Sequence, residues 1–336
     1  MRQPDFRKRR NKNKMKNLYP MKISYVAKSR IWGGHALEMR YGKKPDCEGG
    51  NIGETWELTV RSDEMSSIIS GEYEGMTLGE YIESDKSVLG IKYDGGRFPL
   101  LIKFIDACDK LSVQVHPDDE YAKKNEKDPG KTEMWYIIDA KPGAKIVYGL
   151  ADGVGKEEFA AAVKENRIGT AMGYREVRAG ETYFIPSGLL HAIGEGIIIA
   201  EIQQNSDLTY RVYDYDRRDA KGNLRELHIA KALDVVRPFT EDEINAIRYE
   251  ARDAHDDENT LAHCRYFKVN KYSLHGEKMF CADKDSFVSL LVLSGSGKIT
   301  ARGTEYEIKA GDSLFIPASL GEFAVTGYVE IITSSL

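Results

Sequence analysis

The chain has 336 residues, of which 41% are hydrophobic and 30% charged, a balance that excludes an intrinsically disordered or fibrous protein. The net charge of −5 is uneven, because residues 1–17 carry eight Lys or Arg against one Asp, which leaves the rest of the chain at about −12. An acidic body disfavours nucleic acid as a partner.

The sequence predicts a soluble, cytoplasmic protein with no membrane partner. No run approaches about 18 consecutive apolar residues, and the N-terminal segment lacks the apolar stretch of a secretory signal. Residues 1–17 contain one aromatic side chain, Phe6, so we expect segment 1–20 to be a disordered basic tail. The cysteines include no C-x-x-C pair, which argues against a disulfide framework or a cysteine metal site. They stand at Cys47, Cys108, Cys264 and Cys281.

From Tyr25 onward, short apolar or alternating runs are separated by Gly, Pro and Asp, the pattern of an antiparallel sandwich or barrel. The predicted strands cover residues 54–60, 99–105, 111–116, 133–138, 145–149, 182–185, 197–203, 287–293, 305–308 and 313–316. Helices are predicted at 77–89, where Thr77 and Glu80 form a capping box, and at 157–168 and 226–236. The fold class is therefore mainly β with a few short helices.

An internal repeat divides the chain into two units. VRAGETYFIPSGLLHAI (177–193) and IKAGDSLFIPASLGEFAV (308–325) share a turn, a strand and a terminating proline. The repeat resembles the second signature motif of the cupins, a family of double-stranded β-helix (jelly-roll) barrels. We therefore expect a catalytic cupin domain over 21–237, a linker over 238–262 and a second cupin-like domain over 263–336. His191 in the first copy corresponds to Glu322 in the second, so we expect only the first to hold a metal.

Polar side chains alternate with apolar ones in LSVQVH (111–116). Alternation sends Ser112, Gln114 and His116 to one face of the strand, toward whatever the sheet encloses. Buried polar groups need partners, and a metal with its ligands would supply them.

Two further residues complete a candidate ligand group. Glu133 heads an apolar strand, where a buried carboxylate needs strong compensation, and His191 lies in the first repeat copy. With His116 they form a set of two histidines and one carboxylate, and Gln114 is a possible fourth ligand through its carbonyl oxygen. Zinc accepts such ligands and, in catalytic sites, keeps one position open.

Cationic side chains near these strands suggest an anionic ligand. Lys103 lies in a strand that is apolar on both faces, where an ammonium needs an anion. Lys131 stands two residues before Glu133 and is expected on the same side as the metal. Together with Ser112 they could receive a phosphate. Arg211 lies in the polar and aromatic segment 203–217, which lacks the pattern of a regular amphipathic strand.

Taken together, six motifs resemble the type I mannose-6-phosphate isomerases, specifically their shorter bacterial branch, over residues 22–336. They are WGG (32–34), GETWELT (53–59), QVHPDD (114–119), KTEMW (131–135), PSGLLHA (186–192) and NSDLTYRVYDYDR (205–217). The resemblance implies a zinc cupin enzyme that interconverts mannose 6-phosphate and fructose 6-phosphate. It implies one zinc ion per chain on Gln114, His116, Glu133 and His191. The oligomeric state stays open between monomer and homodimer.

The resemblance also assigns roles around the metal. It implies a catalytic arginine at Arg211 and phosphate or substrate contacts at Ser112, Lys103 and Lys131. Isomerisation generates an enediolate, whose charge zinc and Arg211 would stabilise. Because Arg211 stays protonated it is a poor base, and the proton carrier is open between Lys131, a carboxylate and a zinc-bound water.

Two other functions fit parts of the pattern. His116, Asp118 and His191 match the facial triad of an Fe(II) cupin dioxygenase, but Pro117 interrupts the strand between the first two, and Glu133 is left without a role. A non-catalytic sugar-phosphate-binding cupin would keep the lysines and the zinc and show no turnover.

Overall fold

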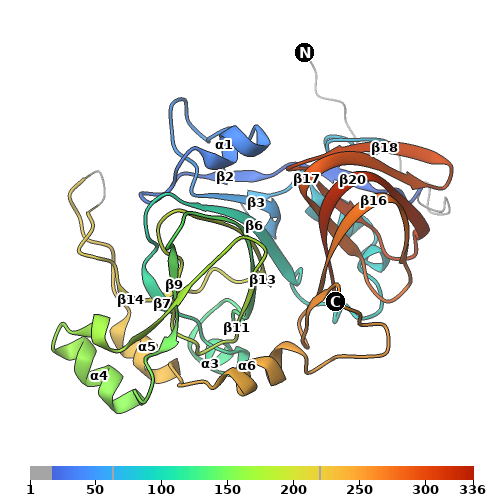
Figure 1. The fold of residues 1–336 in the computed structure, drawn as a ribbon. Helices are drawn as coiled ribbons and strands as arrows, with labels where there is room; N and C mark the ends of the chain where they lie inside the picture. The colour runs from blue at the N-terminus through green and yellow to red at the C-terminus, as the bar shows by residue number, and fades with distance from the viewer. Residues whose placement is uncertain (1–16, 63, 219–220) are drawn as a thin grey trace.

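The computed structural model describes residues 17–62, 64–218 and 221–336 and is mainly β, as predicted. Most of the predicted basic tail, residues 1–16, lies outside the described residues. Figure 1 shows a strand-rich unit in blue-green to yellow beside a second one in orange and red. Within the described residues, every helix is too short or too polar to span a lipid bilayer.

Two antiparallel sheets form the walls of the first unit and curve around each other as a barrel (Figure 1). One has the strand order β10-β9-β12-β7-β14 and the other β11-β8-β13-β6-β3-β2. The strands are β2 (Val26–Lys28), β3 (Glu54–Leu58), β6 (Leu100–Ala107), β7 (Val113–Val115), β8 (Glu133–Ala140), β9 (Lys145–Leu150), β10 (Met172–Glu176), β11 (Thr182–Ile185), β12 (His191–Ala192), β13 (Ile197–Gln204) and β14 (Tyr210–Tyr213).

A third sheet forms the second unit, in the order β1-β19-β17-β20-β16-β15, with β18 paired to β17. Its strands are β1 (Met21–Ile23), β15 (Thr260–His263), β16 (Lys268–Ala282), β17 (Val288–Ala301), β18 (Thr304–Lys309), β19 (Ser313–Ile316) and β20 (Gly321–Ser335). β1 pairs with β19 through Met21 and Phe315, so a segment near the N-terminus supplies a strand to the C-terminal sheet. The predicted domain boundaries stay a prediction. A short ribbon of β4 (Val60–Arg61) and β5 (Glu64–Met65) lies apart from these sheets.

The helices are all short. They are α1 (Ala36–Tyr41), α2 (Leu78–Ser84), α3 (Asp119–Asn125), α4 (Lys156–Lys164), α5 (Ile229–Val235) and α6 (Glu241–Arg248), with 3-10 turns η2 (Lys86–Leu89) and η3 (Ile168–Thr170). The predicted capping box of α2 is confirmed, because the Glu80 N–H donates to Thr77 Oγ1 and the Thr77 N–H donates to Glu80 Oε2. The predicted helix over 77–89 is divided at Asp85, whose carboxylate accepts from the Ser87 N–H and starts η2.

Several strands lie outside the predicted ones, and the longest of them are β16 and β20. No strand was predicted over 268–282 or 321–335, yet β16 and β20 form a long antiparallel pair there, in register from Lys268 with Ser335 to Ala282 with Gly321. Polar residues occur throughout β16 and hide the alternation, and its pairing with a distant strand stabilises it. The expectation of an irregular segment around Arg211 is also wrong, because β14 pairs with β7 there.

Packing outside the barrel turns the polar face of β7 inward. Val113 and Val115 belong to the same buried cluster as Phe159 of α4 and Ala232 of α5. Because successive side chains on a strand point to opposite faces, the alternate residues face the barrel interior. The helices therefore fix the direction in which the candidate ligands point.

Candidate metal centre

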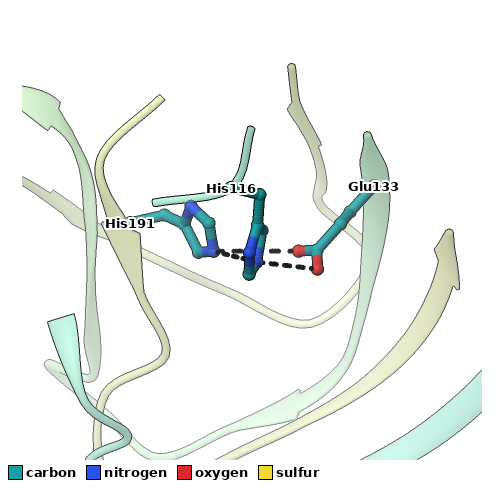
Figure 2. Close-up of side chains that lie close together, drawn as sticks. All are labelled: His116, Glu133 and His191. Atoms are coloured by element: carbon teal, nitrogen blue, oxygen red, sulfur yellow. Dashed lines mark hydrogen bonds and ion pairs between the residues drawn. The ribbon is translucent and has the colours of Figure 1, made fainter. Parts of the chain in front are cut away.

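Three side chains converge inside the first barrel, as Figure 2 shows. His116 follows β7 directly, Glu133 begins β8 and His191 begins β12, and each side chain is at most 1% exposed. The Nε2 atoms of the two histidines lie 3.1 Å apart. Glu133 Oε1 lies 3.2 Å from His116 Nε2, and Glu133 Oε2 lies 3.9 Å from His191 Nε2. The predicted ligand group is therefore brought together.

The two facing sheets supply these ligands from opposite sides. β12 pairs with β7 through His191 and Gln114, which places both histidines on one sheet. Glu133 belongs to the other sheet and pairs with Gln203 of β13. The Glu133 carboxylate thus meets the two imidazoles from the opposite side of the barrel.

Burial keeps both imidazoles neutral. Burial, aided by the nearby Lys131 ammonium, lowers the pKa of His116 to about 3, and burial also lowers the pKa of His191. Burial alone would raise the pKa of Glu133, but Lys131 and His116 hold it well below its usual range. His191 Nδ1 lies 2.8 Å from the Leu189 carbonyl oxygen and donates to it, which leaves the Nε2 lone pair toward the centre.

This donor set fits a divalent metal ion. Ligands of a tetrahedral zinc ion stand about 2.0–2.2 Å from it and hence roughly 3.3 Å from one another. The observed distances from His116 Nε2 to the other two ligands, 3.1 and 3.2 Å, match that spacing. Two neutral imidazoles and one carboxylate also suit zinc better than the hard cations calcium and magnesium, which prefer oxygen ligands.

Gln114 adjoins the group without completing it. Its Nε2 lies 3.5 Å from His191 Nε2, and its Oε1 accepts a long hydrogen bond of 3.5 Å from Ser112 Oγ. The amide therefore presents its nitrogen to His191, whereas a metal would require its oxygen. Its role as a fourth ligand stays a prediction.

The two predicted lysines both have carboxylate partners. Lys131 Nζ lies 2.6 Å from Glu133 Oε1 and 3.2 Å from His116 Nε2, on the metal side as expected. Lys103 Nζ lies 3.0 Å from Glu201 and 3.7 Å from Glu54. The anion that Lys103 needs is thus supplied by the chain itself, and its contact with phosphate stays a prediction.

Arg211 lies on β14 next to Ser112, which directly precedes the neighbouring strand β7. Arg211 Nε donates to Ser112 Oγ at 3.2 Å, and its Nη1 donates to the Glu226 carbonyl oxygen. Its backbone N–H donates to His228 Nδ1. Asp214 instead pairs with Arg217 and Arg225. Among the described residues no carboxylate lies within ion-pair distance of Arg211, so its charge is available to a ligand.

A cavity of about 660 Å³ adjoins the centre. The predicted residues in its wall are Lys103, Ser112, Gln114, Lys131 and Arg211. Gln114 and Lys131 each contact a member of the ligand group, so the cavity adjoins that group through these two side chains.

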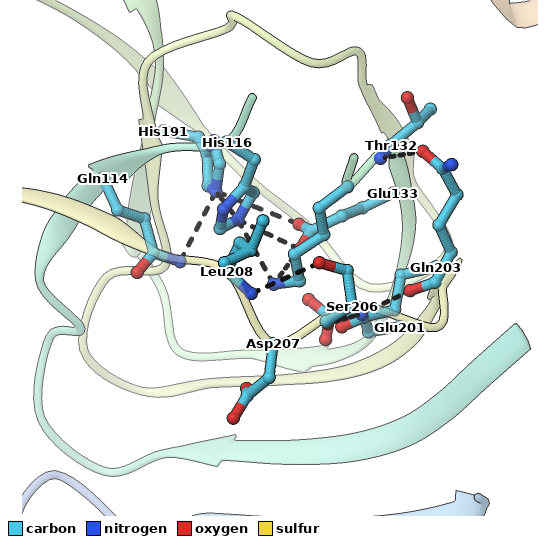
Figure 3. A network of polar contacts seen from close by, with 12 residues as sticks. Gln114, His116, Thr132, Glu133, His191, Glu201, Gln203, Ser206, Asp207 and Leu208 are labelled. Carbon is cyan, nitrogen blue, oxygen red and sulfur yellow. Dashed lines mark hydrogen bonds and ion pairs between the residues drawn. The ribbon is translucent and has the colours of Figure 1, made fainter. Parts of the chain in front are cut away.

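The cavity wall also contains residues that the sequence analysis missed. They are Glu54, Trp135, Glu201, Asp207 and His228, among others. Figure 3 shows Glu201 and Asp207 in the same polar surroundings as the histidines. Glu201 had a detectable signal, because a carboxylate in the apolar run IIIAEIQQ of β13 is as conspicuous as Lys103 in β6. Asp207 follows β13 in an irregular turn, where no periodicity marks it.

Asp118 of the rival ligand set and Glu322 of the second repeat copy both lie outside the ligand group. Asp118 caps α3, accepting from the Tyr121 N–H at 2.8 Å, and is not part of the group. Glu322 in the second copy is exposed on β20. In the described part of the chain, the other acid and histidine cluster is Asp253, Asp256 and His263, outside the second copy, and Asp256 is already paired with Lys268.

Comparisons with known proteins agree with this architecture. Residues 20–143 match the family described as phosphomannose isomerase type I, catalytic domain, and residues 257–336 match the mannose-6-phosphate isomerase cupin domain. The chain is 40% identical over 320 residues to mannose-6-phosphate isomerase ManA of Bacillus subtilis (strain 168), which covers 94% of this chain and 99% of that protein. It is 35% identical over 318 residues to the mannose-6-phosphate isomerase of Streptococcus mutans serotype c, with 94% and 98% covered.

A solved structure supports the same conclusion. The mannose 6-phosphate isomerase from Bacillus subtilis superposes with a TM-score of 0.84 at 35% sequence identity, covering 94% of this chain and 99% of that chain. The match confirms the predicted fold class.

Proposed function

The chain belongs to the type I phosphomannose isomerase family, and on that premise we propose that it interconverts mannose 6-phosphate and fructose 6-phosphate with one zinc ion on His116, Glu133 and His191. The observation that carries the proposal is the buried convergence of these three ligand atoms beside a cavity lined by charged groups. As a member of this family the protein is an isomerase.

Different residues around the cavity would bind the substrate and stabilise the charge that develops during the reaction. Bound zinc would act as a Lewis acid on the oxygens of the open-chain sugar. Ser112 and Lys103 would hold the remote phosphate, whose binding energy positions carbons 1 and 2. Arg211, a cation with no carboxylate partner among the described residues, would stabilise the negative charge that develops on the enediolate.

Proton transfer between the two carbons needs a group in the cavity wall. Lys131 is our candidate, because its buried amine lies beside the metal ligands and faces the cavity. Glu201 lines the same cavity and is the carboxylate alternative. Lys103, Lys131 and Glu201 are at most 4% exposed, and this burial strengthens their charge interactions.

A coupled assay tests the proposal directly. Fructose 6-phosphate formation from mannose 6-phosphate is followed with the full chain, before and after treatment with a chelator. We expect turnover that the chelator abolishes and added zinc restores. Turnover that persists in metal-free protein would overturn the zinc requirement. Binding of mannose 6-phosphate without turnover would favour the non-catalytic cupin, and Fe(II)-dependent oxygen consumption would favour a dioxygenase.

Elemental analysis gives a second expected result. The purified chain should hold about one metal ion, because the second repeat copy presents Glu322 on an exposed strand where the first presents His191. Two tightly bound ions per chain would contradict the single-site proposal and would direct attention to Asp253, Asp256 and His263.

A further inference from the structure

Trp135 links a candidate metal ligand to a second buried carboxylate. It lies on β8 two residues after Glu133, so both side chains point to the same face of the strand. Its indole Nε1–H is 3.0 Å from Glu133 Oε2 and 3.0 Å from Glu201 Oε1, and it donates to both oxygens. The residue is 1% exposed, so no bulk water substitutes for this donor.

The same indole ring also contacts a second candidate ligand. The ring centroids of Trp135 and His191 lie 5.4 Å apart at 76°, an edge-to-face contact. Trp135 is paired with Glu201 across β8 and β13, which fixes the backbone of both. One side chain therefore touches two of the three ligands and lines the substrate cavity.

The two oxygens of Glu133 have different partners as a result. Oε2 is held by the Trp135 N–H, whereas Oε1 lies beside Lys131 and His116. We propose that Trp135 is a positioning residue for the metal centre: its indole N–H holds Glu133 Oε2 and so fixes the carboxylate in the orientation that places Oε1 beside His116 Nε2. This inference rests on the proposed metal function.

Trp135→Phe is the direct test, because it keeps an aromatic ring and removes the N–H. Removing a hydrogen-bond partner of a metal ligand typically lowers metal affinity about 10- to 100-fold, and we expect the zinc affinity of Trp135→Phe to fall by a factor in that range. The affinity is measured on the full chain by zinc competition with a chromogenic chelator at fixed pH. Thermal unfolding of the metal-free proteins checks that the variant is folded.

Trp56→Phe is a matched control. Trp56 is 2% exposed, lies on β3 of the same sheet, and donates its indole N–H to Glu54 Oε2 at 2.7 Å. It makes the same kind of bond to a buried carboxylate that is not a candidate ligand. We expect its zinc affinity to stay within about threefold of wild type, because its partner is outside the ligand group. An equal loss in both variants would overturn the positioning role.

A measurement on the unmodified side chain remains decisive if Trp135→Phe does not fold. The chain has three tryptophans, so the indole N–H signals in a nitrogen-15 NMR spectrum can be assigned through Trp32→Phe and Trp56→Phe. We expect the Trp135 signal to shift on zinc addition more than the Trp56 signal. An unmoved Trp135 signal, or unchanged zinc affinity in folded Trp135→Phe, would overturn the inference while wild-type zinc binding leaves the proposed function intact. Absence of zinc binding in wild type would overturn both.

Discussion

Replacing His191 with alanine is expected to abolish zinc binding and turnover together. The side chain is fully buried, its Nδ1 is used by the Leu189 carbonyl, and its Nε2 has the other ligands at 3.1 and 3.9 Å. Removing it leaves two ligand atoms and a space that alanine cannot fill. We expect turnover to fall at least about a thousandfold, equivalent to about 4 kcal/mol of lost transition-state stabilisation.

Metal content and activity are measured on the same preparation, with His263→Ala as the matched control. His263 is also a buried histidine bonded to a carboxylate, Asp256, and belongs to the other acid and histidine cluster. The control should keep both zinc and activity. Full metal content in His191→Ala would refute the ligand assignment, and loss of zinc in His263→Ala would move the metal to the second cluster.

Arg211→Ala is expected to lower turnover far more than substrate affinity. The guanidinium has no carboxylate partner among the described residues, so its charge is free to meet the enediolate, which exists only during the reaction. Loss of one such donor typically costs about 100- to 1000-fold in kcat, whereas KM should change less than about threefold. Steady-state kinetics with mannose 6-phosphate measures both.

Arg211→Lys separates charge from shape. Lysine keeps a positive charge but lacks the planar fork that donates to Ser112 and to the Glu226 carbonyl at once. We expect it to recover a part of the turnover lost in the alanine variant. A large rise in KM with unchanged kcat in Arg211→Ala would instead make this residue a phosphate anchor next to Ser112.

The ligand group could be predicted from the sequence because strand alternation is a local property. In LSVQVH, the apolar residues Val113 and Val115 require one buried face, which sends His116 to the other. Glu133 was also recognisable locally, because a buried carboxylate at the start of an apolar strand needs strong compensation. The motif resemblance then supplied what alternation could not, namely that residues far apart in sequence meet.

Long-range pairing accounts for most of what was missed. β16 is polar along much of its length, and its pairing with the distant strand β20 stabilises it where local preference does not. Arg211 lies on a strand because β14 pairs with β7, and the local sequence around Arg211 does not indicate this pairing. The contacts that orient Gln114 and Lys103 come from side chains on other strands, His191 and Glu201. The sequence therefore marked Gln114 and Lys103 as site residues but did not reveal these partners.

The pairing of β1 with β19 affects how the protein is made. Met21 leaves the ribosome about 290 residues before its partner Phe315, and at roughly 5 to 20 residues per second this delay is about 15 to 60 s. Until translation ends, the nascent chain therefore carries a strand without its neighbour. β1 is three residues long, and so brief an unpaired edge offers little template for mispairing with other chains.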